Sequence, residues 1–202
     1  MQKSKRLTQK LKRNARISKY VIYKETLIDF KEQFWSFVGA FVGIGLIAFI
    51  QSFYLPKLEN VLLIGSFGAS SVLIFGAIQS PLTQPRSFVG GQIVSGLIGV
   101  TVAKLFPELI WIAAPLAVAT SIVAMQMTKT LHPPGGATAL IAVIGTEKIK
   151  SLGYLYILSP VLTGTIILFI TALVFNNLTK NRRYPTNGRL TKIFLSKGLR
   201  NK

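Results

Sequence analysis

The chain has 202 residues, of which 50% are hydrophobic and only 15% charged, yet its formal net charge is +18 from 24 Lys and Arg against 6 Asp and Glu. Soluble domains carry about a quarter charged residues, whereas a chain that is both hydrophobic and basic is typical of a small polytopic membrane protein with basic flanks. This composition disfavours a disordered chain, the absence of cysteine disfavours a disulfide-stapled domain, and the few acidic residues and single histidine disfavour an enzyme.

Positive charge is concentrated at the two ends. Residues 1–33 hold 10 Lys and Arg and residues 180–202 hold 8, so 6 remain for the 146 residues between them. The positive-inside rule then predicts two cytoplasmic tails flanking a membrane domain at 34–179 in the cytoplasmic (inner) membrane, with an even number of spans. Residues 18–33 mix aromatic, aliphatic and charged side chains, which predicts an interfacial amphipathic helix. We expect the tails to contact anionic lipid headgroups. We do not expect them to bind nucleic acid, because nucleic-acid-binding proteins carry their positive charge on one face of a folded domain.

Residues 34–179 are predicted to form an all-α, polytopic transmembrane helical bundle. A hydrocarbon core of about 30 Å needs about 20 helical residues. Uncharged runs of about this size or longer occupy 34–53, 61–80, 87–103, 109–128 and 151–179, and a shorter one occupies 133–146. Because both tails are basic, we expect the short run to complete a sixth crossing, with Leu131 and His132 in an unwound half. Four spans plus two re-entrant segments is the alternative count.

Two segments of the chain read alike. Residues 68–70 and 136–138 both have the pattern Gly-Ala-hydroxyl, and each opens an apolar run that ends at a glycine. On the six-span count they lie in spans two and five, so the halves form a 3+3 repeat of opposite orientation. Inverted repeats with broken, glycine-rich helices are a transporter pattern. The alternative is a chance match of two short apolar segments.

Small residues recur at intervals of four. Gly39 and Gly43 form one such row, and Gly91, Ser95 and Gly99 form another. Such rows let helices approach closely. They predict a closely packed bundle and fit a homo-oligomer, but they carry no chemistry.

Residues 131–140 (LHPPGGATAL) carry the strongest chemical signal. Paired prolines disfavour helix before them and suit the first turn of a new one, and paired glycines permit close approach. A helix that begins here presents N–H groups and a positive dipole end to an anion, unless the segment is only a tight turn in which the histidine bonds a carbonyl. We predict a substrate-binding or pathway role for His132, Pro133, Pro134, Gly135, Gly136 and Thr138.

A second polar stretch covers residues 65–71 and 79–86. It predicts a broken, hydroxyl-lined helix followed by a turn with two prolines, after which Arg86 either anchors the topology or attracts anions. The pathway residues predicted here are Ser66, Gly68, Ser70, Ser71, Gln84 and Arg86. The proposed spans hold no carboxylate, so the polar side chains favour small anions or neutral solutes. One histidine and no cysteine predict neither a metal site nor a cofactor.

Four blocks in this order resemble the HPP family of integral membrane proteins: GSFGASSVLIFG at 65–76, SPLTQPR at 80–86, LHPPGGATALIAVIG at 131–145 and NRRYP at 181–185. The resemblance covers about residues 34–185. It implies a multi-span protein, often described with four predicted spans, and nitrite transport, the activity assigned to plastid and cyanobacterial relatives. We therefore expect a transporter or channel for a small inorganic anion, nitrite being the candidate. The alternative is a non-transporting membrane scaffold or sensor component.

Overall fold

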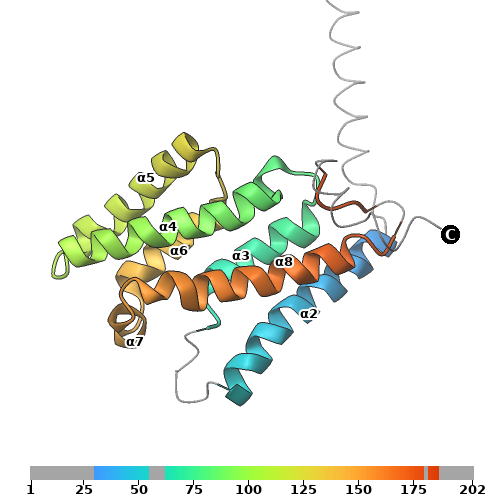
Figure 1. Ribbon diagram of the computed structural model, residues 1–202, viewed down its shortest axis with the longest axis horizontal. Helices are drawn as coiled ribbons and strands as arrows, with labels where there is room; N and C mark the ends of the chain where they lie inside the picture. The colour runs from blue at the N-terminus through green and yellow to red at the C-terminus, as the bar shows by residue number, and fades with distance from the viewer. Residues whose placement is uncertain (1–29, 55–61, 180–181, 187–202) are drawn as a thin grey trace, which may run out of the picture. The chain divides into compact units, whose positions relative to one another are not determined.

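The computed structural model describes residues 30–54, 62–179 and 182–186, and every regular element within them is a helix. The elements are α2 (Phe30–Tyr54), α3 (Gly65–Ser71), η2 (Val72–Gly76), η3 (Pro81–Thr83), α4 (Pro85–Leu105), α5 (Ile110–Thr128), α6 (Pro133–Ile144), α7 (Glu147–Ser151), η4 (Ile157–Leu162) and α8 (Thr163–Phe175) (Figure 1). The predicted basic tails and the interfacial helix lie outside the described residues, apart from residues 30–33 and 182–186. The described residues from Trp35 onward belong to one compact unit, which the rest of this section concerns.

The all-helical prediction is confirmed for the described residues. Within the described residues, four helices are long and apolar enough to cross a membrane: Phe30–Phe53, Pro85–Leu105, Ile110–Thr128 and Ile157–Phe175. Two shorter apolar helices, Gly65–Gly76 and Pro133–Ile144, lie between them in the chain. This count matches the alternative prediction of four spans plus two re-entrant segments. The arrangement with six spans stays a prediction.

Two of the runs expected to be continuous are broken. The run at 61–80 yields only the helix Gly65–Gly76, because the chain turns after Gly76 and the Ser80 hydroxyl accepts a hydrogen bond from Leu82 N in the next turn. The run at 151–179 contains an extended residue, Ser159, directly before Pro160. A proline disfavours helical backbone at the residue before it, which explains the second break.

Helices α3 and α8 both run antiparallel to α2. Near one end of α2, Ser36 Oγ donates to Phe75 O, and near the other end Gln51 Oε1 accepts from Leu62 N. The segment 62–76 thus runs antiparallel to α2 over most of its length. Helix α8 is parallel to α3, since Phe67 lies against Gly164 at the start of both and Asn176 Nδ2 donates to Ile74 O at the end of both.

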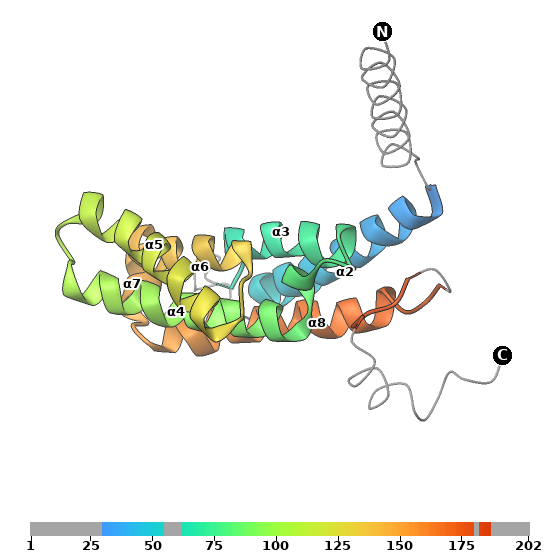
Figure 2. The same ribbon diagram turned by 90° about the horizontal axis from the view of Figure 1, so that it is seen from above.

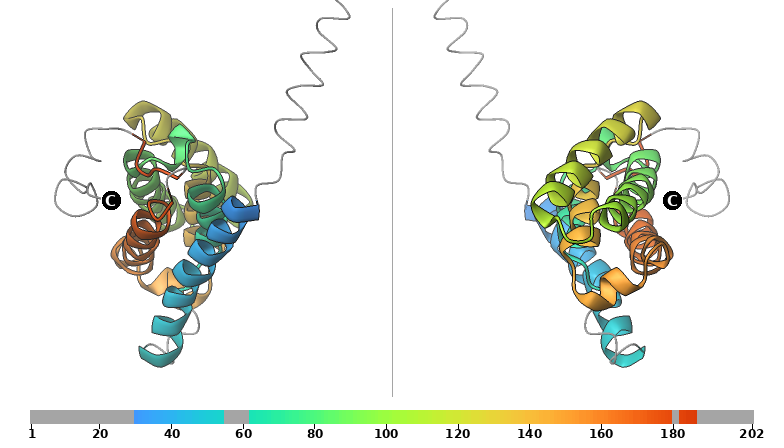
Figure 3. Two further views of the ribbon diagram at one scale, coloured as in Figure 1. Left: turned by 90° about the vertical axis from the view of Figure 1, so that its right-hand side faces the viewer. Right: turned by 90° about the vertical axis from the view of Figure 1, so that its left-hand side faces the viewer.

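Helices α4, α5 and α6 form a second closely packed group. Along α4 and α6 the contacts advance together, from Gly91 with His132 to Gly99 with Ala139, so the two helices are parallel. Helix α5 runs antiparallel to both and packs against both, and α6 lies between them and α3 (Figures 2 and 3). Helix α4 is antiparallel to α8, because Phe88 stacks on Phe169 while Gly96 lies against Ile157. It follows that α3 and α6, the two short helices, are antiparallel.

The segment Arg182–Thr186, which we call the strap, closes the end of the bundle where α3 stops and α4 begins. Arg182 is buried and donates to Phe75 O and Asn176 Oδ1, each within 2.9 Å. Tyr184 is buried too, and its hydroxyl donates to Thr83 O at 2.7 Å. Two carbonyl groups left without helical partners by the break between α3 and α4 are thereby satisfied.

Small residues set the distance between α4 and α6, as their spacing predicts. A Cβ added at Gly99 would lie 2.6 Å from the backbone oxygen of Ala139, and one added at Gly91 would lie 2.6 Å from the Thr130 oxygen. Ser95 sits between them, buried, with its hydroxyl on the sulfur of Met125. Close helix packing through this row is confirmed.

We expect Gly99→Ala to destabilise the protein, because the new methyl group meets backbone and not a movable side chain. Overpacking of this kind costs about 1–3 kcal/mol. The matched control is Gly45→Ala in α2, where an added Cβ meets nothing within 4 Å and higher helix propensity contributes up to about 1 kcal/mol. Thermal unfolding of the two purified variants in detergent measures the difference, and equal melting temperatures would contradict the packing argument.

Candidate functional site

His132 lies at the N-terminal cap of α6 and is fully buried. Its Nδ1 is 2.9 Å from Leu82 O and its Nε2 is 3.0 Å from Ser70 Oγ. Its ring and the ring of Phe88 form a T-shaped pair, with centroids 5.2 Å apart. The single histidine therefore joins the start of α6 to α3 and to the turn before α4.

The hydrogen bonds continue from His132 into a chain that we call the polar chain: Leu82 O, His132, Ser70, Gln92 and Thr138. Gln92 Nε2 donates to Ser70 Oγ at 2.9 Å, and Thr138 Oγ1 donates to Gln92 Oε1. All four side chains have no exposed surface. Buried polar groups need partners, and this chain supplies them across three helices.

The pattern of donors favours a neutral imidazole. Because Leu82 O can only accept, Nδ1 carries a proton, and Nε2 of the neutral ring then accepts from the Ser70 hydroxyl. A charged ring would direct a second donor at Ser70 beside that of Gln92 and leave the serine proton without an acceptor. Within the polar chain His132 thus acts as a relay between two partners and supplies no net positive charge.

The amides at the start of α6 are not presented to an open site. Pro133 and Pro134 have no N–H, and Gly135 N donates to His132 O at 2.8 Å. A Cβ at Gly135 would lie 2.5 Å from Ser95 Oγ and 3.0 Å from Gly91 O. The expected anion site at this helix end is therefore occupied by close packing against α4 in the described conformation. The prolines and glycines start the helix as predicted, and they allow this contact.

The other predicted residues are placed in different surroundings. Ser66 and Ser71 are buried on α3, and neither hydroxyl has a hydrogen-bond partner within the described parts of the chain. Gly68 is exposed, with open space where a Cβ would lie. Gln84 is buried and holds the turn, since its amide donates to Ile78 O and Ser80 O.

Arg86 is exposed, and its guanidinium donates to Thr128 O at 2.8 Å. It caps the end of α5, where Lys129 adopts a left-handed backbone with φ of 57°. Of the twelve predicted residues, the structure thus joins His132, Ser70 and Thr138 into one network with the start of α6. Gln84 and Arg86 lie at the end of the bundle and hold the turns there.

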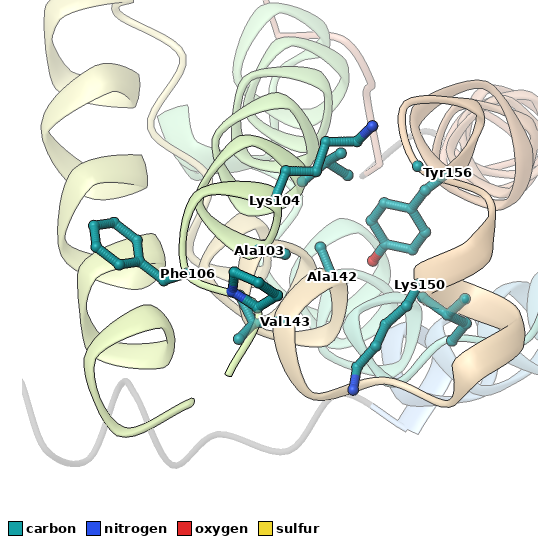
Figure 4. Close-up of a pocket in the computed structure, with 11 residues that line it drawn as sticks. Ala103, Lys104, Phe106, Ala142, Val143, Lys150 and Tyr156 are labelled. Carbon is teal, nitrogen blue, oxygen red and sulfur yellow. The ribbon is translucent and has the colours of Figure 1, made fainter. Parts of the chain in front are cut away.

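A cavity of about 220 Å³ lies near the other end of α4, between α4, α6, α7 and the segment that follows α7. Two lysines, Lys104 and Lys150, line it together with apolar side chains and Tyr156 (Figure 4). Lys104 Nζ lies 5.0 Å from the centre of the Tyr154 ring, and Lys150 Nζ is 3.1 Å from Glu147. The cavity is thus apolar inside, and the side chains of Lys104 and Lys150 form part of its wall, with the ammonium group of Lys150 paired with Glu147.

Tyr156 connects this cavity to the polar chain. Its side chain is fully buried, and its hydroxyl donates to Thr138 O at 3.0 Å. Thr138 is the end member of the polar chain, so polar groups follow one another from the lysine-lined cavity to Leu82.

Gln92 and Tyr156 were missed as site residues by sequence reasoning. Gln92 is the one amide side chain in the run at 87–103, and a polar side chain inside a span is a signal for function or helix contact. Tyr156 has no comparable signal, because tyrosine is common at membrane interfaces. Among the described residues, no group of three His, Cys, Asp or Glu could hold a metal ion.

Comparison with known proteins agrees with the pattern of blocks. The family profile described as "HPP, transmembrane region" matches residues 25–185. Two transmembrane proteins of Dictyostelium discoideum are 44% and 42% identical over 160 residues, which is 78% of this chain and 51% and 56% of theirs. The chain thus spans about half the length of these curated relatives. No solved structure matches it.

The polar chain predicts unequal effects of two serine substitutions on the same helix. Ser70→Ala leaves Gln92 Nε2 and His132 Nε2 each without a hydrogen-bond partner, and a buried unpaired polar group costs about 1–3 kcal/mol. Ser66→Ala removes an equally buried hydroxyl that has no hydrogen bond, so we expect a much smaller loss. Thermal unfolding of both variants compares them, and a larger loss for Ser66→Ala would contradict the network.

Proposed function

Because this chain belongs to the HPP transmembrane family and has four helices able to cross a membrane, we propose that it is a multi-pass transporter or channel for a small inorganic anion. Nitrite, which the resemblance implies, is the substrate to test first. The proposal places the protein in the cytoplasmic membrane with both basic tails on the cytoplasmic side, in contact with anionic headgroups.

The lysine-lined cavity and its link to the polar chain carry this proposal. Lys104 and Lys150 attract an anion to the cavity, where a low-dielectric wall strengthens their field. Beyond it, Tyr156, Thr138 and Gln92 each bring an O–H or N–H group. None of these three bears a negative charge, so they suit a monovalent anion better than a cation.

The described conformation is closed in this proposal. The start of α6 packs on α4, and the imidazole of His132 is held on both nitrogens. Movement of α6 away from α4 and α3 would expose the amides after the two prolines, which then supply the anion site that the motif predicts. Transporters with broken helices place their sites at such helix ends.

We further propose six crossings arranged as two inverted halves. Segment 62–76 extends along α2 from the level of Gln51 to that of Ser36. Segment 128–144 extends along α4, since Arg86 reaches Thr128 O near one end and Val143 shares an apolar cluster with Val102 near the other. Each short helix, with its extended flank, thus covers about the same length as the long helix beside it, and consecutive segments reverse direction.

Reconstituted protein is expected to carry nitrite into liposomes faster than protein-free liposomes take it up. Lys104→Gln combined with Lys150→Gln should lower the flux several-fold, because both charges at the cavity are lost. Lys148→Gln is the matched control, since Lys148 is on the same short helix as Lys150 but does not line the cavity. The proposal is wrong if the wild-type protein gives no more flux than empty liposomes for nitrite, nitrate, formate, chloride and bicarbonate. That result would favour the alternative, a non-transporting scaffold or sensor component.

Single cysteines distinguish the two topologies cleanly, because the chain has none of its own. With six crossings, Glu108→Cys and Thr146→Cys react with an impermeant maleimide from the same side of the membrane. With four spans and two re-entrant segments, the two positions lie on opposite sides. Both residues are exposed in loops, so labelling of sealed vesicles before and after permeabilisation decides between them.

A further inference from the structure

Gln92 joins the two segments whose sequences are alike. Its amide nitrogen bonds Ser70, which ends Gly-Ala-Ser in α3, and its amide oxygen bonds Thr138, which ends Gly-Ala-Thr in α6. The two helices are antiparallel. A two-fold rotation that superposed Gly-Ala-Ser of α3 on Gly-Ala-Thr of α6 would therefore exchange the hydroxyls of Ser70 and Thr138. The amide of Gln92 lies between these two hydroxyls.

The environment makes this amide hard to release. Gln92, Ser70 and Thr138 all have no exposed surface, and hydrogen bonds are strengthened where water is excluded. If α3 and α6 part, at least one end of the amide loses its partner. Separation is therefore disfavoured until water or a polar solute enters to replace that partner.

We propose that Gln92 is the latch that keeps the polar chain closed, and that rotation of its side chain away from Ser70 and Thr138 admits water and a small anion between α3 and α6. The identity of the anion rests on the proposed function. The latch itself concerns access to the interior, so it can be tested without transport.

Ser66 offers a position from which to observe that access. It lies four residues before Ser70 and therefore on the same face of the helix. Its side chain is fully buried, and its hydroxyl is without a hydrogen-bond partner within the described residues. A route that becomes hydrated on opening would leave such an unpaired group in its closed state. Replacing this serine with cysteine changes little in size and breaks no hydrogen bond of the structure.

The experiment measures how fast Ser66→Cys reacts with a small, charged methanethiosulfonate in membrane vesicles. Adding Gln92→Ala should raise the labelling rate about tenfold or more. The substitution removes hydrogen bonds of the closed form, and their loss shifts the equilibrium constant between closed and open forms about tenfold toward the open form. Gln92→Asn, whose shorter side chain cannot span both hydroxyls, should raise it as well. This milder variant serves if the alanine variant does not fold.

Gln51→Ala is the matched control. Gln51 is also a buried glutamine, and its Oε1 accepts from Leu62 N at 2.7 Å, outside the polar chain. The latch predicts that Gln51→Ala leaves the labelling rate of Ser66→Cys close to that of the parent. An equal increase in both glutamine variants would show general loosening and overturn the proposal.

Two further results would overturn it. One is an unchanged rate in the folded Gln92 variants, and the other is a parent Ser66→Cys that already reacts as fast as the exposed Thr146→Cys. Nitrite flux of the wild-type protein is measured in parallel. An absence of flux defeats the proposed function alone, while the labelling rates still decide whether Gln92 is a latch.

Discussion

A break in a buried helix leaves carbonyl and amide groups that need partners other than water, and this bundle is organised around that constraint. His132, at the start of α6, bonds Leu82 O in the turn between α3 and α4 and Ser70 Oγ on α3. The break after α3 is met by the strap, through Arg182 and Tyr184. Without these side chains, polar groups beside the two short helices would be left unpaired in a low-dielectric interior. The most distinctive residues of the sequence are therefore those that supply these hydrogen bonds.

The proposed change of state depends on the same arrangement. A chain of hydrogen bonds that runs through single side chains can be opened at one bond, whereas a continuous helix cannot. Gln92 lies in that chain between Ser70 and Thr138, and Tyr156, which lines the cavity with the two lysines, donates to the backbone oxygen of Thr138. In the proposed mechanism the same few contacts control both stability and access to the interior, so substitutions of Ser70 or Gln92 bear on both.

Much of the fold could be predicted from local chemistry. The paired prolines specify where α6 begins, because each lacks an N–H and constrains the residue before it. The rows of small residues specify that α4 approaches another helix closely, although not that the partner is α6. The lengths of α3 and the last span were harder to predict, since the apolar runs continue through the breaks at Gly76 and Ser159 and hydropathy does not register a change in backbone direction.

The candidate site, too, was predictable from the sequence only in part. The sequence alone determined that the chain is a basic, helical membrane protein and that His132 stands at a helix start, because composition, charge placement and proline geometry are local properties. Only the tertiary structure decided that His132, Ser70 and Thr138 meet, that Gln92 joins them, and that the start of α6 is packed against Gly91 and Ser95. These contacts connect residues 22 to 62 positions apart, and no local pattern specifies which of several buried hydroxyls will face one amide once antiparallel helices have packed.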